Sequence, residues 1–239
     1  MTTSDFSLWA YLSGTPLLWL TLTLVAYALA DAFSKRTRRH PLANPVLHSV
    51  WVIGLVLVVS KTPYRDYFDG AQFIHFLLGP ATVALAVPLY RNRQIVVRSL
   101  VPMVAALVAG SAAAIVSVVW LGELASLPRL VLLSIAPKSV TAGVSMGISQ
   151  SLGGDVSLTA VTTIATGVIG AIVVTPLMNA LGMKDWRARG FAAGLAAHGI
   201  GTARALQVHP LAGTFSGIAM GLNAAVTAFL VPLLVQYLL

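Results

Sequence analysis

Two basic residues, Lys138 and Arg204, stand inside apolar stretches of this sequence, where charged residues are rare. An arginine or lysine at the centre of a membrane-spanning helix costs about 2.5–3.5 kcal/mol on insertion scales, so a cation at that depth usually serves a function. All seven acidic residues lie in loops or at the ends of apolar stretches. A small anion is therefore one partner that we predict for the two cations.

Both cations follow residues that interrupt a helix. Pro137 directly precedes Lys138, and Gly199 and Gly201 precede Arg204. Interrupted backbone at membrane depth is tolerated only where it is buried in protein or lines a wet cavity, and the N-terminus of a half-helix attracts anions. The alternative is structural: both cations contact helix carbonyls or an acid at a span end, or Arg204 reaches the membrane surface.

Polar residues near these interruptions complete the predicted substrate site. Hydroxyl and carbonyl oxygens there are able to bind sodium, and a histidine is able to carry a proton near neutral pH. A histidine inside a membrane is also commonly a packing residue, so both roles remain open. The predicted substrate-binding residues are His75, Thr82, Lys138, Ser139, Thr141, His198, Gly199, Gly201, Thr202, Arg204 and Asn223.

The composition requires a membrane protein built from helices. Hydrophobic residues make up 57% of the 239 residues and charged residues only 9%, against about 25% in soluble domains. The net charge of +8 comes from basic clusters between apolar runs, which indicates cytoplasmic loops rather than a nucleic-acid surface. The chain has no cysteine and no recognisable catalytic or nucleotide-binding motif, so we expect neither an enzyme, a metal site nor a cofactor.

The apolar runs predict an all-α polytopic protein with about seven or eight transmembrane segments in one domain, 1–239, with halves at 15–121 and 128–239. Interruptions are expected near Pro80, Pro137 and Gly199. The predicted spans are 15–33, 45–60, 71–90, 99–121, 128–150, 156–181, 191–208 and 211–238.

The span at 128–150 has two interpretations. If it crosses, the basic loop 182–189 falls outside the cell; if it enters and leaves on one side, that loop is cytoplasmic with 34–44 and 91–98. The second interpretation also makes the spans at 71–90 and 191–208 antiparallel. Both contain Gly-x-x-Thr, at Gly79 and at Gly199, which suggests an inverted repeat.

Four stretches together resemble the LrgB/CidB family over most of the chain. They are Pro63–Phe68, Leu78–Tyr90, Pro137–Thr141 and His198–Leu206. The resemblance implies either holin-like or antiholin-like control of murein hydrolases and cell lysis, or transport like that of plastidal glycolate/glycerate translocators and bacterial pyruvate carriers. It also implies a multi-pass protein of the bacterial inner membrane.

The resemblance implies a small LrgA/CidA-like membrane partner, and we expect a homo-oligomer that binds no nucleic acid. The sequence departs from the family pattern after Pro137–Thr141. Ala142 and Gly143 replace a threonine and a proline, and Gly147 and Gln150 replace two glutamates. Our first functional hypothesis is a secondary carrier of small monocarboxylates such as pyruvate, glycolate or glycerate, and the alternative is a holin-like regulator.

Overall fold

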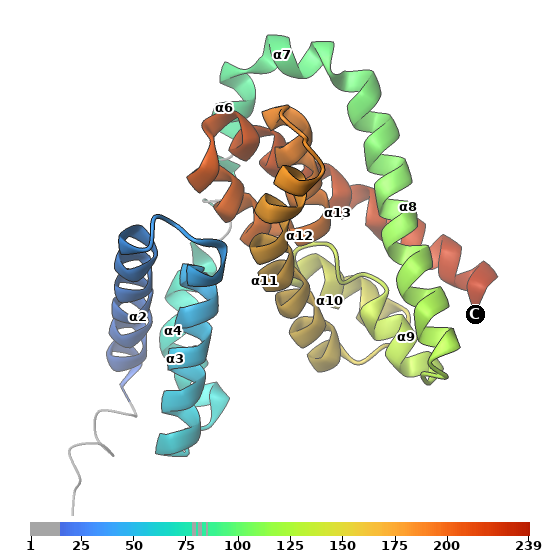
Figure 1. The fold of residues 1–239 in the computed structure, drawn as a ribbon. Coiled ribbons are helices and arrows are strands. Elements are labelled where there is room, and N and C mark those ends of the chain that lie inside the picture. The colour runs from blue at the N-terminus through green and yellow to red at the C-terminus, as the bar shows by residue number, and fades with distance from the viewer. Residues whose placement is uncertain (1–14, 78–79, 81–82, 85) are drawn as a thin grey trace, which may run out of the picture. The chain divides into compact units, whose positions relative to one another are not determined.

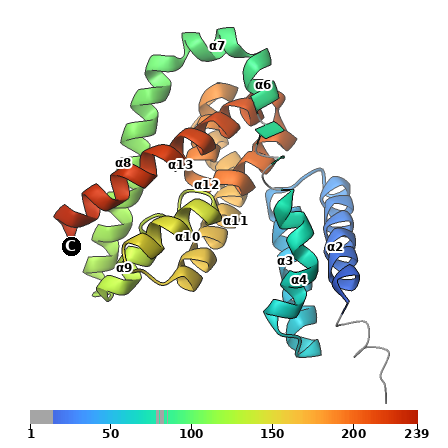
Figure 2. The same cartoon turned by 180° about the vertical axis from the view of Figure 1, so that it is seen from behind.

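A computed structural model describes residues 15–77, 80, 83–84 and 86–239 (Figure 1, Figure 2). The regular elements in these residues are all helices, which confirms the predicted fold class. Their contacts group into two compact units, Met1–Ala84 and Leu85–Leu239. These units are defined by contacts between residues, whereas the predicted halves at 15–121 and 128–239 are the two parts of a possible inverted repeat. The predicted halves therefore remain a prediction.

In the first unit one long apolar helix packs against the two α-helices that follow it. The unit contains α2 (Pro16–Arg36), the short 3-10 helix η1 (Pro41–Ala43), α3 (Pro45–Ser60) and α4 (Tyr64–Phe76). A proline begins α2, η1 and α3, where its fixed φ suits the first helical turn. Trp19 of α2 is fully buried and meets the Tyr67 ring of α4 edge to face at 5.9 Å.

Several predicted features of this region cannot be placed. Gly79 and Thr82 lie outside the described residues, as does the side chain of His75, whose backbone belongs to α4. The interruption near Pro80 and the Gly-x-x-Thr echo therefore stay predictions.

The second unit contains the long helices that frame the candidate site. Its elements are α6 (Ala86–Arg91), α7 (Arg93–Arg98), α8 (Leu100–Leu124), α9 (Arg129–Ile135), α10 (Ala142–Ser151), α11 (Val156–Ala180), α12 (Trp186–Val208) and α13 (Pro210–Leu238). Among the described residues, α2, α8, α11 and α13 are long and apolar enough to cross a membrane, and α3 is a shorter apolar helix. The 25 residues of α8 span about 37 Å, more than the bilayer's hydrocarbon core of about 30 Å.

The predicted span at 128–150 is a helical hairpin, here called hairpin 1. Its arms are α9 and α10, and residues 136–141 form its tip. The Thr159 hydroxyl oxygen of α11 lies within hydrogen-bond distance of both arms, 2.9 Å from the Ser134 carbonyl oxygen on the first and 2.7 Å from the Ser149 hydroxyl on the second. Those two residues would lie about 22 Å apart on one straight helix, so the chain must turn back between them.

The predicted span at 191–208 also turns back, which corrects our expectation that it crosses. The α12 backbone is non-helical at Ala197 and at His198, where φ is 39°. The rings of Trp186, at the start of α12, and His209, just after its end, stack 4.8 Å apart. A straight helix would separate those residues by about 35 Å. Residues 186–196 and 199–208 are therefore the arms of a second hairpin, here called hairpin 2.

A glycine permits the close approach of the two arms of hairpin 2. A Cβ atom at Gly201 on the second arm would collide with the Ala193 carbonyl oxygen of the first arm and with the Ala197 methyl group in the turn. A larger residue would thus push the arms apart. The sequence signals an interruption through its glycines, but the reversal itself is centred on His198.

The two hairpins enter from opposite ends of α8. At the start of α8, the Arg187 guanidinium of hairpin 2 lies 3.5 Å from the hydroxyl of Ser99. At its other end, Gly122 packs against Leu132 of hairpin 1. The loops 91–98 and 182–189 therefore share one face and the turn after hairpin 1 lies at the other, as the hairpin interpretation of 128–150 requires.

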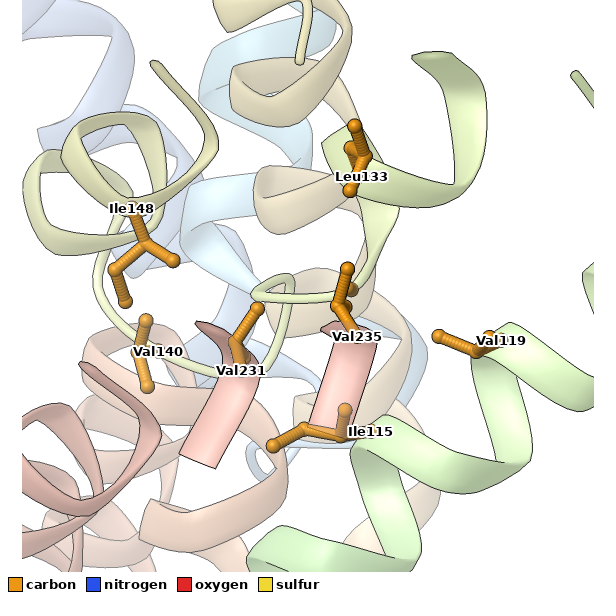
Figure 3. Packing of buried hydrophobic residues seen from close by; sticks show 8 residues of the cluster. Ile115, Val119, Leu133, Val140, Ile148, Val231 and Val235 are labelled. Atoms are coloured by element: carbon orange, nitrogen blue, oxygen red, sulfur yellow. The ribbon is translucent and has the colours of Figure 1, made fainter. Parts of the chain in front are cut away.

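A hydrophobic core holds hairpin 1 against α8 and α13. Its buried side chains point toward one another from α8, from both arms and the tip of hairpin 1, and from the second half of α13 (Figure 3). They are Ile115, Val119, Leu133, Ala136, Val140, Ile148, Val231 and Val235. A second core, around Phe191, Leu195 and Phe215, joins the first arm of hairpin 2 to α13 and α8. Hairpin 1 thus packs on the second half of α13 and the first arm of hairpin 2 on its first half.

Candidate functional site

Asn223, in the middle of α13, ties the two hairpins together. Its side-chain nitrogen donates to the Ser139 carbonyl in the tip of hairpin 1 at 3.2 Å and to the Leu195 carbonyl of hairpin 2 at 3.0 Å. Its side-chain oxygen accepts from the hydroxyls of Ser111 in α8, at 2.6 Å, and Thr227, at 3.0 Å. These four bonds use both donor hydrogens and both favourable acceptor directions of the amide.

Asn223 is therefore a cross-link between the two interruptions. It is 1% exposed, and the carbonyls it binds lie at helix breaks, where the regular i→i−4 bonding pattern stops. We predicted it as a substrate ligand, but in this conformation its amide has no bonding direction left for a substrate. The structure does bring the two predicted break regions together.

His198, at the tip of hairpin 2, makes a second link between the hairpins. Its Nε2–H donates to the Thr163 carbonyl of α11 at 3.0 Å, because a carbonyl oxygen can only accept. The Thr163 hydroxyl in turn shares a 2.8 Å hydrogen bond with Ser145 on the second arm of hairpin 1. Gly167, one turn along α11, leaves room for the imidazole, since a Cβ atom there would collide with the ring.

The His198 backbone is strained. A φ of 39° is unfavourable for any residue with a Cβ atom, and such strain costs of order 1–3 kcal/mol. Gly199, which tolerates that geometry, is the next residue but does not occupy the position. The imidazole is thus held at the turn by its surroundings, which is typical of functional sites.

Thr202 fixes the start of the second arm of hairpin 2. Its hydroxyl donates to the His198 carbonyl at 2.8 Å and shares a 2.9 Å bond with the hydroxyl of Ser216 in α13. Thr202 is 3% exposed, so these bonds are shielded from water.

Lys138 lies in the tip of hairpin 1, next to the Ser139 carbonyl that Asn223 binds. The lysine is partly buried, and its ammonium group makes no hydrogen bond or ion pair within the described part of the chain. Thr141 directly precedes α10, and its side chain does not cap that helix. A cation and the positive end of a helix dipole thus adjoin in one tip.

Arg204 lies away from both tips, on the second arm of hairpin 2. It is 7% exposed and lines a cavity of about 20 Å³, large enough for roughly one water molecule, together with Trp186 and Arg189. The tip segment 136–141 contributes none of that cavity's walls. The predicted sharing of one carboxylate by Lys138 and Arg204 finds no support in this arrangement.

Residues that sequence reasoning missed form much of the network. Ser111, Ser145, Thr163 and Ser216 are all buried, and each bonds a predicted residue or a partner of one. Their signal is weak, because single hydroxyls in apolar helices usually bond the carbonyl four residues earlier. Within the described residues, no group of three or more His, Asp or Glu side chains is placed to hold a metal ion.

Asp185 and Arg187 form an exposed ion pair at the start of hairpin 2. The Asp185 carboxylate caps the start of α12 by accepting from the Arg187 backbone N–H at 2.8 Å, and it lies 2.6 Å from the Arg187 guanidinium. Hydrogen bonding to that guanidinium, the main cause, and the capping bond lower the pKa of Asp185. Because both side chains are more than 40% exposed, the pair stabilises the first turn of α12 only modestly.

Comparison with known proteins identifies the family. The model of the LrgB-like family matches residues 23–237. A holin-like protein CidB of Staphylococcus epidermidis is 33% identical over 218 residues, which cover 91% of this chain and 95% of that protein. An uncharacterised Bacillus subtilis protein, YxaC, is 35% identical over 90% of this chain and 94% of its own length.

A holin-like protein CidB of Staphylococcus aureus is 31% identical over 92% of this chain and 95% of its own length. No solved structure matches the chain. The relatives' names agree with the holin-like alternative better than with the carrier hypothesis. The extent of these matches and the apolar helices show that the chain is a bacterial membrane protein belonging to the LrgB family.

Proposed function

We propose that this protein carries small carboxylate anions across the bacterial membrane, with its binding site where the two hairpin tips meet. The observation that supports this most is that Asn223 binds both hairpins at their helix interruptions, although the hairpins enter from opposite faces. Discontinuous helices meeting near the bilayer midplane are a recurring way to build a transport site. Pyruvate, glycolate and glycerate are the substrates that the family resemblance suggests.

Lys138 is the residue we propose to bind the anion. Its ammonium group is a partly buried positive charge next to the N-terminus of α10, and both favour a carboxylate. Ser139 and Thr141 place further polar groups in the same tip, and the tip of hairpin 2 adds the Gly199 backbone and the His198 side chain. In this scheme Arg204 supports the second arm instead of contacting the anion.

Alternating access follows from the opposite entry of the hairpins. Each tip is reached from one membrane face, so movement of one hairpin would open the shared site to that face while the other hairpin closes it. We propose that the protein acts as a homo-oligomer, with or without a small LrgA/CidA-like partner.

Uptake into proteoliposomes tests the proposal. Purified protein, alone or with its LrgA-like partner, should give saturable uptake of labelled pyruvate, glycolate or glycerate. Lys138→Ala should weaken apparent affinity at least about 30-fold, since removing one partner of a desolvated charge pair costs about 2 kcal/mol or more. Lys184→Ala, which removes an exposed loop lysine, is the matched control and should be unchanged. Equal apparent affinity of the Lys138→Ala and Lys184→Ala variants would show that Lys138 does not bind the anion.

The second candidate is a holin-like regulator that permeabilises the membrane or controls murein hydrolases. The printed names of the Staphylococcus relatives favour it. A permeabilising protein would release a trapped dye from the same vesicles without saturable uptake. That result, with the partner present or absent, would replace the carrier proposal with the holin-like one.

A further inference from the structure

We propose that an anionic phospholipid of the cytoplasmic leaflet binds in a slot between α8, the first arm of hairpin 2 and α13. The slot is a cavity of about 620 Å³, and its occupant would be one acyl chain with the headgroup phosphate at the open, basic end. This proposal does not rest on the carrier function.

The slot is wide enough for hydrocarbon but narrower than a protein helix. On α8 its walls run along one helix face from Pro102 through Ala106 to Gly110, and Arg98 and Ser99 lie just before that helix. Eight residues of helix rise about 12 Å. Spread over that length, 620 Å³ corresponds to a mean cross-section of about 50 Å². A helix about 10 Å across needs roughly 80 Å², so a protein helix is too wide.

The walls are apolar along the slot and charged at one end. Met103, Phe191, Leu195 and Phe215 line the interior, whereas Arg98, Asp185 and Arg187 lie at the end near the start of α8. Arg187 is paired with Asp185 at 2.6 Å. The net positive charge at the opening therefore comes from Arg98, which is exposed.

The open end lies on the membrane face where anionic lipids gather. The neighbouring segments 91–98 and 182–189 carry Arg91, Arg93, Lys184 and Arg189, and such basic segments between membrane spans mark the cytoplasmic side. Basic pockets between transmembrane helices on that side are known to bind lipid headgroups. A lone basic loop would attract anionic lipids weakly, but here it adjoins a slot that is able to hold the chain.

The slot is separate from the proposed carboxylate site. Lys138, Ser139 and Asn223 do not line it. A small monocarboxylate would also leave most of the 620 Å³ apolar slot unfilled, whereas an acyl chain would remove that surface from water or disordered lipid.

Thermal unfolding of the full-length protein in detergent tests the proposal. Dioleoyl phosphatidylglycerol should raise Tm more than dioleoyl phosphatidylcholine, which has the same chains but a zwitterionic headgroup. Ala106→Trp should fill the slot and abolish the rise. Ala109→Trp is the matched control, because Ala109 is exposed on α8 but does not line the slot, and it should keep the rise.

A milder variant covers the case in which Ala106→Trp fails to fold. Arg98→Gln should weaken phosphatidylglycerol binding about fivefold, the effect of one basic residue at a membrane surface, and Lys184→Gln should weaken it less. Equal shifts with both lipids, or a full shift in Ala106→Trp, would overturn the proposal. If oleate alone raised Tm as much as phosphatidylglycerol does, the occupant would be a free fatty acid, and the proposal would also be overturned.

Discussion

Replacement of Asn223 by aspartate should separate the two hairpin tips while changing the side-chain shape very little. The substitution exchanges the side-chain nitrogen, which donates to the carbonyls of Ser139 and Leu195, for an oxygen. Both carbonyls would then lack their donor and face another acceptor. A buried acceptor left without its partner costs about 1–3 kcal/mol, so the two together should cost about 2–6 kcal/mol of unfolding free energy.

Ser111→Ala is the graded comparison. It removes only one of the two hydroxyls that donate to the Asn223 side-chain oxygen, which keeps the 3.0 Å bond from Thr227. The expected cost is about 1 kcal/mol. Ser117→Ala, at an exposed position of the same helix, should change stability by less than about 0.5 kcal/mol. Urea or thermal unfolding in one detergent gives this order directly.

Cross-linking measures whether the two hairpin tips move apart. A general loss of stability would not change their distance in protein that is still folded. The carbonyl oxygens of Ser139 and Leu195 both lie within 3.2 Å of one nitrogen atom. The chain has no cysteine, so a Ser139→Cys, Leu195→Cys pair is free of background. A short thiol cross-linker should join this pair when Asn223 is present, and should join it more slowly when the Asn223→Asp substitution is added. Unchanged stability together with unchanged cross-linking would refute the proposed tie.

Three further predictions concern the hairpins. His198→Gly should be more stable than His198→Ala in thermal unfolding, the reverse of the usual order, because only glycine relieves the strain at φ 39°; a lower Tm for the glycine variant would contradict the strained turn. The pKa of Asp185 is lowered on folding, so its contribution to stability is present above about pH 3.9 and is lost as pH falls through the lower folded value. The Tm difference between the wild-type protein and Asp185→Asn should accordingly shrink below about pH 3.9, and a constant difference would show that the ion pair is not responsible. The single-cysteine variants His209→Cys and Gly153→Cys should be labelled from opposite sides of the membrane; labelling from the same side would contradict the opposite entry of the hairpins.

The sequence predicts where the helices are interrupted better than what the chain does at each interruption. Proline and glycine act locally, so Pro137 and the glycines around His198 mark both breaks correctly. Reversal of the chain depends on tertiary contacts instead. Basic loops favour a hairpin at 128–150, but hydropathy gives the same signal whether 191–208 crosses or returns. The stacking of Trp186 on His209 shows that it returns.

The sequence likewise identifies unusual polar residues but not the contacts that they make. Asn223 stands out in the sequence as a polar residue in an apolar run, yet its role depends on partners 28 and 84 residues away along the chain. Arg204 stands out equally, and a cation inside an apolar stretch is a reasonable candidate for anion binding. Its position beside Trp186 and Arg189 follows from the reversal at His198, which composition does not reveal. Of the two cations, only Lys138 lies in a hairpin tip, that of hairpin 1.

Three of the residues that depart from the family pattern in hairpin 1 lie on its exposed face and not on the face that bonds α11. Gly143, Gly147 and Gln150, which stand at family-pattern positions, lie on the side of α10 away from α11, and a Cβ atom at either glycine would meet no neighbour within 4 Å. Ser145 and Ser149, on the opposite face, are buried against Thr163 and Thr159 of α11. Loss of the two glutamates therefore changes the charge of an outer face and leaves the bonded crossing intact. If those glutamates couple an ion in the family, this chain lacks these coupling groups but keeps the tip that holds Lys138.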